Sequence, residues 1–442
     1  MNQSDNIAAP ASAVGGAVTV IRLSGPEVLN IANTVWQGRT PLSAANARKM
    51  LLGKVAGDPT LAVYMKAPFS YTGDDVVELQ CHGGAASANA VMKLLLSSGC
   101  RLAEPGEFTC RAFLNGKLDL LQAEAVADLI SSASESAMQM AQKQLAGSLS
   151  SRIDELYDLI ISLRSECESR LDFPDEELDF DDLVPAKVNE AYRQISELIA
   201  TARAGSIIRD GVQVVLAGKP NSGKSSLLNR ILGYDRAIVS SIPGTTRDTV
   251  ESSAVIRNIP VNLTDTAGLR ESDDPVEIMG IERSRSTIRR GRITFWLLDA
   301  SADDLQAEVD SIDRSAKGLI AVWNKCDAAG ARVLPETALP TVKISALTGE
   351  NLSSLFDEFE NQVFEGDGSH RMPELAVNAR SSALLEASLE HLQAASKCFE
   401  EGDYELAAAE LAEASVKIGE ITGRRVAPDI LDKIFHKFCI GK

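Results

Sequence analysis

The stretch VQVVLAGKPNSGKSSLLNRIL, residues 212–232, decides the fold of the central part of this chain. An apolar run typical of a strand precedes GKPNSGKS, which fits the pattern G-x-x-x-x-G-K-[ST], and a run typical of a helix follows it. Gly218 and Gly223 allow the backbone to curl so that its N–H groups face phosphate oxygens. Lys224 would reach the β- and γ-phosphates of a nucleotide, and the Ser225 hydroxyl would ligate Mg²⁺. The order of strand, glycine loop and helix therefore predicts a P-loop domain.

Two further motifs offer groups for a metal ion and for the γ-phosphate. PGTTRD, residues 243–248, supplies Thr246 as a second Mg²⁺ ligand in a switch loop. DTAG, residues 265–268, follows an apolar run. Asp265 would hold the metal through a water molecule, and the Gly268 N–H would meet the γ-phosphate.

Two motifs later in the chain indicate guanine. NKCD, residues 324–327, follows a strand-like run, and the Asp327 carboxylate can pair with the two N–H donors of the guanine edge. SAL, residues 345–347, would close the base pocket through backbone contacts. Chance is a negligible explanation for all these motifs in this order, so the sequence predicts a Ras-like α/β P-loop GTPase domain. The residues expected to contact GTP are Asn221, Ser222, Gly223, Lys224, Ser225, Ser226, Ser240, Ser241, Ile242, Pro243, Gly244, Thr245, Thr246, Asp265, Thr266, Ala267, Gly268, Asn324, Lys325, Asp327, Ser345, Ala346 and Leu347.

The second switch lacks the glutamine that orients the attacking water in Ras-like GTPases. Leu269 follows Gly268, and Arg270 and Glu271 come next. If the chain hydrolyses GTP, another group must hold the water.

Composition limits the classes of protein to which the chain can belong. Of its 442 residues, 45% are hydrophobic, which is ordinary for a globular protein with a core. With a net charge of −18, the chain is not expected to bind nucleic acid strongly unless a more basic partner contributes to the binding. No apolar run is long enough to span a membrane, and the start MNQSDNIAAP lacks the features of a signal peptide, so we expect a cytoplasmic protein. Seven scattered cysteines without a Cys-x-x-Cys pair indicate neither a zinc knuckle nor a disulfide framework.

The sequence divides into four segments. Residues 1–117 mix short apolar runs with Gly and Pro, which predicts an α+β N-terminal domain. Residues 118–207 carry apolar positions at helical spacing, residues 208–367 alternate strand-like with helix-like runs, and residues 368–442 are again helical. The simplest architecture is an α/β GTPase domain inserted into an all-α helical domain that follows the N-terminal domain.

Several stretches outside these motifs resemble one family. They are YTGDDVVELQCHGG (71–84), PGEFTCRAFLNGKLDLLQAEAVADLI (105–130), LDFPDEELDF (171–180) and FCIGK (438–442). None of them belongs to a general GTPase signature. Together with the GTPase motifs they resemble the MnmE family, also called TrmE, whose members modify the wobble uridine of certain tRNAs. The resemblance covers nearly the whole chain.

The resemblance implies that dimerisation of the GTPase domains and a bound K⁺ replace the missing glutamine. Asn221 would offer a side-chain oxygen to K⁺, which would neutralise charge that develops on the phosphates. The backbone carbonyls near Ser240, Ile242 and Thr245 would complete the K⁺ shell. The water-orienting carboxylate of the family matches Glu277, and Glu282 is a nearby alternative.

The resemblance also implies that the N-terminal domain forms a homodimer and binds a one-carbon tetrahydrofolate, in its 5,10-methylene or 5-formyl form. The positions that match the family's folate contacts are Arg22, Glu78, Lys117 and Lys442. A carboxylate suits the amino-pyrimidine edge of a pterin, and cations suit its carbonyl or glutamate groups. The stretch ASAVGG (11–16) departs from the Pro-Pro-Gly-rich turn usual in the family, so one edge of this site differs.

Cys439 in the FCIGK tail matches a cysteine that the family links to its modification reaction. It is either a nucleophile, with His436, Lys437 and Lys442 as nearby cations, or a packed cysteine in a terminal helix. The implied partner is an FAD-dependent flavoprotein of the MnmG (GidA) kind, in a heterotetramer or a larger complex. The implied product carries a 5-aminomethyl or carboxymethylaminomethyl group on the wobble uridine of a tRNA, with ammonium or glycine as the nitrogen donor.

A regulatory switch GTPase of the Era type is the alternative function. Such a protein binds RNA or the ribosome and performs no chemistry on it. Because a pure switch needs neither the N-terminal segment nor FCIGK, these two features favour tRNA modification.

Overall fold

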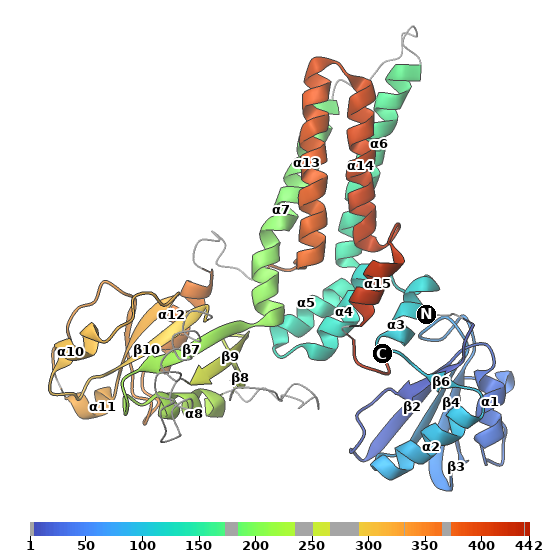
Figure 1. Ribbon diagram of the computed structural model, residues 1–442, viewed down its shortest axis with the longest axis horizontal. Helices are drawn as coiled ribbons and strands as arrows, with labels where there is room; N and C mark the ends of the chain where they lie inside the picture. The colour runs from blue at the N-terminus through green and yellow to red at the C-terminus, as the bar shows by residue number, and fades with distance from the viewer. Residues whose placement is uncertain are drawn as a thin grey trace, which may run out of the picture. The chain divides into compact units, whose positions relative to one another are not determined.

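The computed structural model describes residues 4–172, 184–234, 251–265, 291–330, 332–364, 373–436 and 438–442. The chain divides into two compact units. The first unit consists of Met1–Ala127, Lys143–Ile195 and Ala383–Lys442, and the second of Asp128–Gln142 and Ser196–Ser382. Most of the second unit is therefore inserted between two helical parts of the first, as the colouring by residue number in Figure 1 makes visible.

The first unit contains a six-stranded sheet in the order β3-β4-β5-β2-β1-β6. Its strands are β1 (Ile7–Pro10), β2 (Val18–Ser24), β3 (Leu51–Val55), β4 (Asp58–Met65), β5 (Val76–His82) and β6 (Arg101–Leu102). All neighbouring strands pair antiparallel except β1 and β6, which are parallel. A short 3₁₀ helix, η1 (Ala44–Asn46), and the helices α1 (Val28–Val35) and α2 (Ala85–Ser97) complete this part.

Alternation of side chains explains this sheet. Along β2 the buried positions include Ile21 and Leu23, and Arg22 between them points to the other face. The buried side chains pack with Leu79 of β5 and with apolar residues of α1 and α2, which cover this face of the sheet. The opposite face carries Arg22 beside a smaller apolar cluster that includes Ala9 and Phe108.

The helices of the first unit, with those that continue into the second, fall in two stretches of the chain. They are α3 (Glu107–Leu114), α4 (Leu120–Ser131), α5 (Glu135–Leu145), α6 (Ser148–Asp172), α7 (Val184–Asp210), α13 (Ala379–Glu401), α14 (Tyr404–Thr422) and α15 (Pro428–Phe435). An extensive contact joins α6 to α14, which run antiparallel (Figure 1).

A seam of apolar residues holds α6 and α14 together. The buried side chains of α6 recur at alternating intervals of four and three residues: Leu149, Ile153, Leu156, Ile160, Leu163 and Cys167. The same spacing runs through α14 in Ala407, Leu411, Ala414, Ile418 and Ile421. This is the spacing that lets two long helices interdigitate along their whole contact.

The C-terminal tail lies against the first unit's N-terminal residues. The Phe108 N–H donates to the carbonyl of Lys442 at 3.2 Å. Gly441 has a φ of 95°, and a side chain there would collide with the carbonyl oxygen of Pro10 at the end of β1. Glycine at 441 is therefore required by its backbone conformation and by this close approach.

A buried group of charges lies where α3 begins. The Glu107 carboxylate is fully buried and accepts hydrogen bonds from Arg101 at 2.6 Å and from Arg111 at 3.1 Å. Burial works to raise the pKa of Glu107, but hydrogen bonds from Arg101 and the Glu104 N–H outweigh it and hold the pKa below its ordinary value. Arg111, itself 2% exposed, also donates to the carbonyl of Asp5 at 2.9 Å. The carboxylate of Glu107 therefore ties α3 to β6 and to the start of the chain.

The second unit contains a six-stranded sheet in the order β12-β11-β10-β7-β9-β8. Its strands are β7 (Val212–Gly218), β8 (Glu251–Ile256), β9 (Ile259–Asp265), β10 (Ile293–Asp299), β11 (Leu319–Asn324) and β12 (Thr341–Lys343). Only β8 is antiparallel to its neighbour. The helices α8 (Lys224–Tyr234), α10 (Leu305–Asp310) and α11 (Cys326–Ala329) lie between strands, and α12 (Leu352–Phe364) follows β12.

Apolar clusters lie on both faces of this second sheet. Phe295 and Leu297 belong to one cluster, and Trp296 and Leu298, which alternate with them on β10, belong to the other. A parallel sheet buried on both faces has near-continuous apolar strands, and β10 (ITFWLLD) shows this pattern. Polar ligands of such a sheet bind beyond the carboxyl ends of its strands.

The predicted fold class is confirmed: an α+β N-terminal part, long helices and an α/β domain with a P-loop. The boundaries predicted at residues 117, 207 and 367 stay predictions. Within the described ranges, no helix combines the length and apolarity needed to cross a membrane.

Replacing Glu107 by alanine should lower the free energy of unfolding by about 3 to 5 kcal/mol, because it leaves the buried Arg111 without its closest carboxylate. Urea unfolding at neutral pH, followed by circular dichroism, measures this change. Glu104→Ala is the matched control, since that side chain is exposed three residues earlier. Equal unfolding midpoints for the two variants would contradict the assigned role of Glu107.

Candidate active site

The phosphate loop joins the end of β7 to the start of α8. Gly218 and Gly223 have φ values of 133° and 96°, and Asn221 also lies in the left-handed region at 64°. The Lys224 ammonium, on a side chain that is largely buried, donates to the carbonyls of Gly218 at 3.1 Å and Lys219 at 2.8 Å. The loop therefore wraps around the ammonium group. Its N–H groups lie next to the first turn of a helix, where a phosphate group binds favourably.

Ser225 and Asp265 come together from α8 and from the end of β9. The Ser225 hydroxyl donates to the Asp265 carboxylate at 3.1 Å. A hydroxyl and a carboxylate oxygen are ligand types that Mg²⁺ prefers, so the predicted pair fits this ion. Among the described residues there is no cluster of three or more His, Cys, Asp or Glu side chains that could hold a metal by itself. Other ligands, such as phosphate oxygens and water molecules, would complete the coordination of any Mg²⁺ here.

The side chain of Asn324 connects the phosphate loop with the base side of the site. It lies at the end of β11 and is 2% exposed. Its amide nitrogen donates to the Ser222 carbonyl at 2.8 Å, and its amide oxygen accepts from the Ala346 N–H at 2.9 Å. Position 223 requires glycine because of its backbone conformation. It also requires glycine because a side chain there would collide with the Asn324 amide nitrogen.

Lys325 and Asp327 complete the base side. Lys325 lies in the left-handed region, at a φ of 65°, and donates to the Asp299 carboxylate at 2.6 Å. Burial works to raise the pKa of Asp299, but hydrogen bonds from Lys325 and Ser301 outweigh it and lower that pKa. Asp327 is exposed in the first turn of α11. An exposed carboxylate at this place can accept two N–H groups from a flat base edge.

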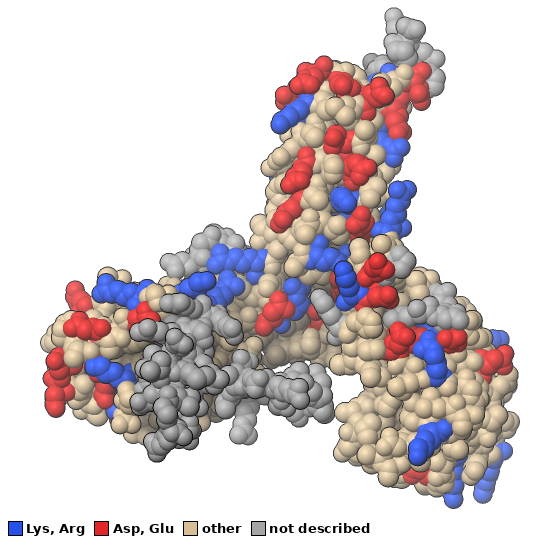
Figure 2. Space-filling view, viewed as in Figure 1, with Lys and Arg blue, Asp and Glu red and all other residues tan. Residues whose placement is uncertain are grey.

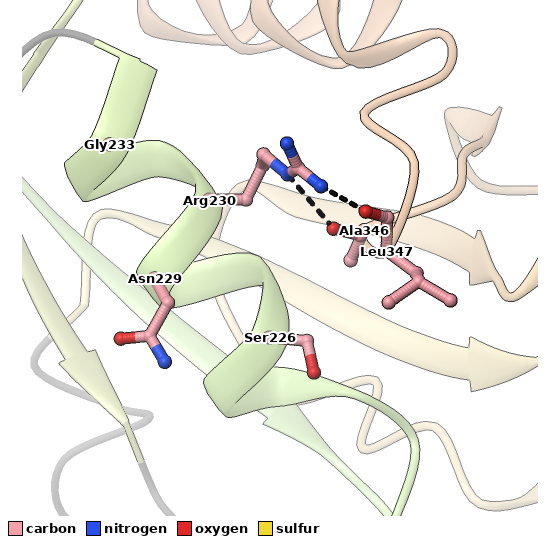
Figure 3. A pocket seen from close by; sticks show the side chains of 6 residues that line it. All are labelled: Ser226, Asn229, Arg230, Gly233, Ala346 and Leu347. Carbon is pink, nitrogen blue, oxygen red and sulfur yellow. Dashed lines mark hydrogen bonds between the residues drawn. The ribbon is translucent and has the colours of Figure 1, made fainter.

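A cavity of about 390 Å³ lies between α8 and the loop after β12 (Figure 3). It is lined by Ser226, Asn229, Arg230, Gly233, Ala346 and Leu347. Arg230 reaches across it: its Nε donates to the Ala346 carbonyl at 3.1 Å, and its Nη2 donates to the Leu347 carbonyl.

Sequence reasoning found only part of this lining. Ser226, Ala346 and Leu347 were predicted, but the contributions of Asn229 and Arg230 were missed. The signal that could have found them is helical spacing. Residues three and four positions after Ser226 lie on the same face of a helix, so they share its surroundings.

Many predicted residues lie outside the described ranges. They are Ser240, Ser241, Ile242, Pro243, Gly244, Thr245, Thr246, Thr266, Ala267, Gly268, Glu277 and the alternative Glu282. The residues that the structure brings together are those of the phosphate loop, Asp265, and those of the loops after β11 and β12.

A second polar cluster lies in the first unit. Arg22 and Glu78 face each other on β2 and β5, with Arg22 Nε 2.8 Å from a Glu78 carboxylate oxygen. The Arg22 guanidinium lies over the rings of Tyr71 and Phe108, 5.1 and 5.7 Å from their centroids. Burial lowers the pKa of the Lys442 ammonium, and the positive charge of Arg22 lowers it further, while Glu78 acts in the opposite direction. The Lys442 ammonium therefore lies within electrostatic reach of this pair.

Two other predicted residues have different surroundings. Lys117 donates to the carbonyl of Pro68 at 3.1 Å, and in the described parts of the chain no interaction connects it with Arg22, Glu78 or Lys442. Cys439 is exposed and lies three residues before Lys442 in the tail. The predicted set is thus divided: three members cluster and Lys117 does not.

Two family models match the chain. The one described as MnmE helical domain matches residues 120–439, and the one described as GTP-binding protein TrmE N-terminus matches residues 6–117. The matched ranges together leave out only the few residues at each end and at the junction between them.

Curated relatives are similar over their full length. The tRNA modification GTPase MnmE of Natranaerobius thermophilus is 39% identical over 455 residues, which cover 99% of both chains. The MnmE of Dichelobacter nodosus is 41% identical over 457 residues and 100% of both chains. The MnmE of Synechococcus sp. (strain JA-3-3Ab) is 41% identical over 459 residues, 99% of this chain and 98% of the relative. A solved G domain of the T. maritima FeoB iron transporter is 24% identical and covers 34% of this chain and 98% of its own, at a TM-score of 0.26 too low to add to the assignment.

Replacing Asp327 by asparagine should weaken binding of a guanine nucleotide by a few kcal/mol, because a charged acceptor for two base N–H groups is lost. Xanthosine triphosphate should bind the variant better than it binds the parent, since its base offers an acceptor where guanine offers a donor. Titration with both nucleotides measures the switch. Asp303→Asn, an exposed carboxylate of the same unit, should leave both affinities unchanged. An unaltered guanine affinity in Asp327→Asn would exclude this residue as the reader of the base.

Proposed function

Because this chain belongs to the MnmE family of tRNA modification GTPases, we propose that it binds and hydrolyses GTP and uses this reaction in the modification of a tRNA. The observation that carries the proposal is the double contact of the buried Asn324 side chain with Ser222 and Ala346. It supports a site in which the phosphate loop and the base loop are held together before any ligand binds.

The arrangement of the phosphate loop supports hydrolysis chiefly by positioning and by charge. Phosphoryl transfer leaves negative charge on oxygens that the protein must match, rather than a covalent step that it must perform. Lys224 supplies one positive charge, and the N–H groups at the start of α8 supply oriented dipoles. Ser225, with Asp265 beside it, would hold a Mg²⁺ ion, which when bound supplies further positive charge to the phosphates.

We further propose that K⁺ and a carboxylate replace the missing glutamine. Asn221 is exposed on the phosphate loop in a left-handed conformation, so its amide oxygen is available to a cation. Backbone carbonyls near Ser240, Ile242 and Thr245 would complete the K⁺ site, and Thr246 would be the second Mg²⁺ ligand. Glu277 would orient the attacking water once the GTPase domains of two protomers meet.

The cluster of Arg22, Glu78 and Lys442 supports a second ligand, for which we propose a one-carbon tetrahydrofolate. Arg22 and Glu78 are 15% and 19% exposed, so a ligand could reach a charged pair that is already partly removed from water. The Glu78 carboxylate would accept from the amino-pyrimidine edge, and Arg22 and Lys442 would meet carbonyl or carboxylate oxygens. The folate would supply a one-carbon unit. Lys117 would take part only through a more distant portion of the ligand.

The exposed Cys439 thiol near Lys442 supports a role in the same reaction rather than in GTP hydrolysis. We propose a homodimer that acts in the cytoplasm with an FAD-dependent partner of the MnmG kind. The proposed product carries an aminomethyl or carboxymethylaminomethyl group at C5 of the wobble uridine. A GTPase that served only as a switch would not need the charged cluster of Arg22, Glu78 and Lys442, which is distant in the sequence from the nucleotide-binding motifs.

GTP hydrolysis should be faster in K⁺ than in Na⁺ at equal ionic strength. In K⁺, the substitution Glu277→Ala should slow hydrolysis roughly a hundredfold without loss of GTP binding. The physical reason is that the carboxylate orients the water while K⁺ neutralises charge on the phosphates. Single-turnover hydrolysis in saturating K⁺ measures both effects. Glu282→Ala is the control and should be milder. Parental rates for Glu277→Ala would show that another group holds the water.

Cys439→Ser should hydrolyse GTP at close to the parental rate and should abolish the modified uridine, because the thiol is assigned to the second reaction alone. Mass analysis of tRNA nucleosides, from cells whose only copy of the gene carries the variant, measures the modification. Ile440→Ala, an exposed neighbour in the tail, is the matched control and should retain it. Loss of modification in both variants would assign the effect to the shape of the tail instead of the thiol.

A further inference from the structure

Arg230 connects two parts of the nucleotide site that are far apart in the sequence. It lies on α8, the helix that begins with the phosphate-binding Lys224. Its guanidinium donates to two successive carbonyls, those of Ala346 and Leu347, as the dashed lines in Figure 3 show. A side chain added at Gly349 would lie 3.7 Å from the guanidinium carbon, so the loop passes close on that side as well.

The backbone of Ala346 is therefore held on both sides of its Cα. Its N–H donates to the Asn324 side chain at 2.9 Å, and its carbonyl accepts from Arg230 at 3.1 Å. Bonds inside the loop shape it further: the Gly349 N–H donates to the Ser345 carbonyl at 2.8 Å, and the Ser345 N–H donates to the Glu350 carbonyl at 3.1 Å. Asn324 joins the loop to the phosphate loop, and Arg230 joins it to the phosphate-binding helix. Each of the two contacts therefore ties the base side of the site to the phosphate side.

The chemistry of the side chain matters for this tie. Arginine presents several N–H groups in one fixed plane, and it can therefore serve two carbonyls at once. Lysine carries its donors on one point charge at the end of a flexible stem, so it could reach a carbonyl here but would not fix the plane in which both carbonyls are held. A neutral short side chain could hold neither.

We propose that Arg230 is a positioning residue that sets the lifetime of the bound guanine nucleotide, by holding the 345–347 loop against α8. The proposal rests on the proposed function, since it presumes that guanine binds beside this loop. Arg230 acts through the loop: when the loop is fixed, the base pocket is closed at low entropic cost, and when the loop is released, the nucleotide leaves sooner. Arg230 thereby belongs with Asp327 among the residues that govern nucleotide exchange, although its role is to hold the pocket and not to read the base.

The test is the rate at which the full-length protein releases fluorescent N-methylanthraniloyl-GDP into excess GDP. Arg230→Ala should release it roughly tenfold faster than the parent, as expected for the loss of charge-assisted hydrogen bonds. Arg230→Lys should give an intermediate rate. Arg257→Ala is the matched control, because Arg257 is an arginine of the same unit that donates to Ser353 and Asp357, and its release rate should equal that of the parent.

A second readout reports on the loop itself and would not respond to a general loss of stability. Amide hydrogen exchange of nucleotide-free protein should rise in residues 344–352 of Arg230→Ala and stay unchanged in β10. Parental release rates, or unchanged exchange in 344–352, would overturn the proposal. If the parent binds no fluorescent GDP, the proposed function fails, and the exchange measurement still decides whether Arg230 holds the loop.

Discussion

The nucleotide site depends on one buried amide, that of Asn324. A primary amide has donors on one side and an acceptor on the other, so a single side chain can bond to a carbonyl and an N–H at once. Asn324 uses this to join Ser222, after β7, to Ala346, after β12. Because the amide is almost fully removed from water, loss of either partner would leave a buried polar group unpaired, which costs free energy. The sheet order, which places β11 between β10 and β12, is what brings the amide to this position.

Several other features follow from that constraint. Gly223 can carry no side chain, since the Asn324 amide occupies the space. Lys325, next in the chain, adopts a left-handed conformation and pairs with Asp299 at the end of β10. The loop that follows β11 is therefore tied to β10 as well. The ends of β7, β9, β10 and β11 thus contribute to one edge, as expected of a parallel sheet. Arg230 adds a tie from the helix side.

The first unit is built from parts that come from opposite ends of the chain, so contacts between distant stretches of sequence hold it together. The regular spacing of apolar residues pairs α6 with α14, although most of the second unit lies between these two helices in the sequence. The tail after α15 returns to β1, where Gly441 passes against Pro10. The fully buried Glu107 fixes α3 by bonds to Arg101 and Arg111, and a buried charge is tolerated only because it is so paired. These contacts bring Lys442 within electrostatic reach of the strand pair of Arg22 and Glu78.

The sequence by itself determined the α/β domain, since the motif at 218–225 specifies both chemistry and a strand–loop–helix order. It also determined the long helices, through apolar spacing, and the family, through stretches such as FCIGK. The pairing of Asn324 with two loops, the reach of Arg230 and the separation of Lys117 from Arg22 were decided only by the tertiary structure. The physical reason is that a local pattern fixes which face a residue occupies, but strand order, register and side-chain reach fix what it meets. Arg22 meets Glu78 because β2 and β5 pair in one register, and nothing within either strand's own sequence states that register.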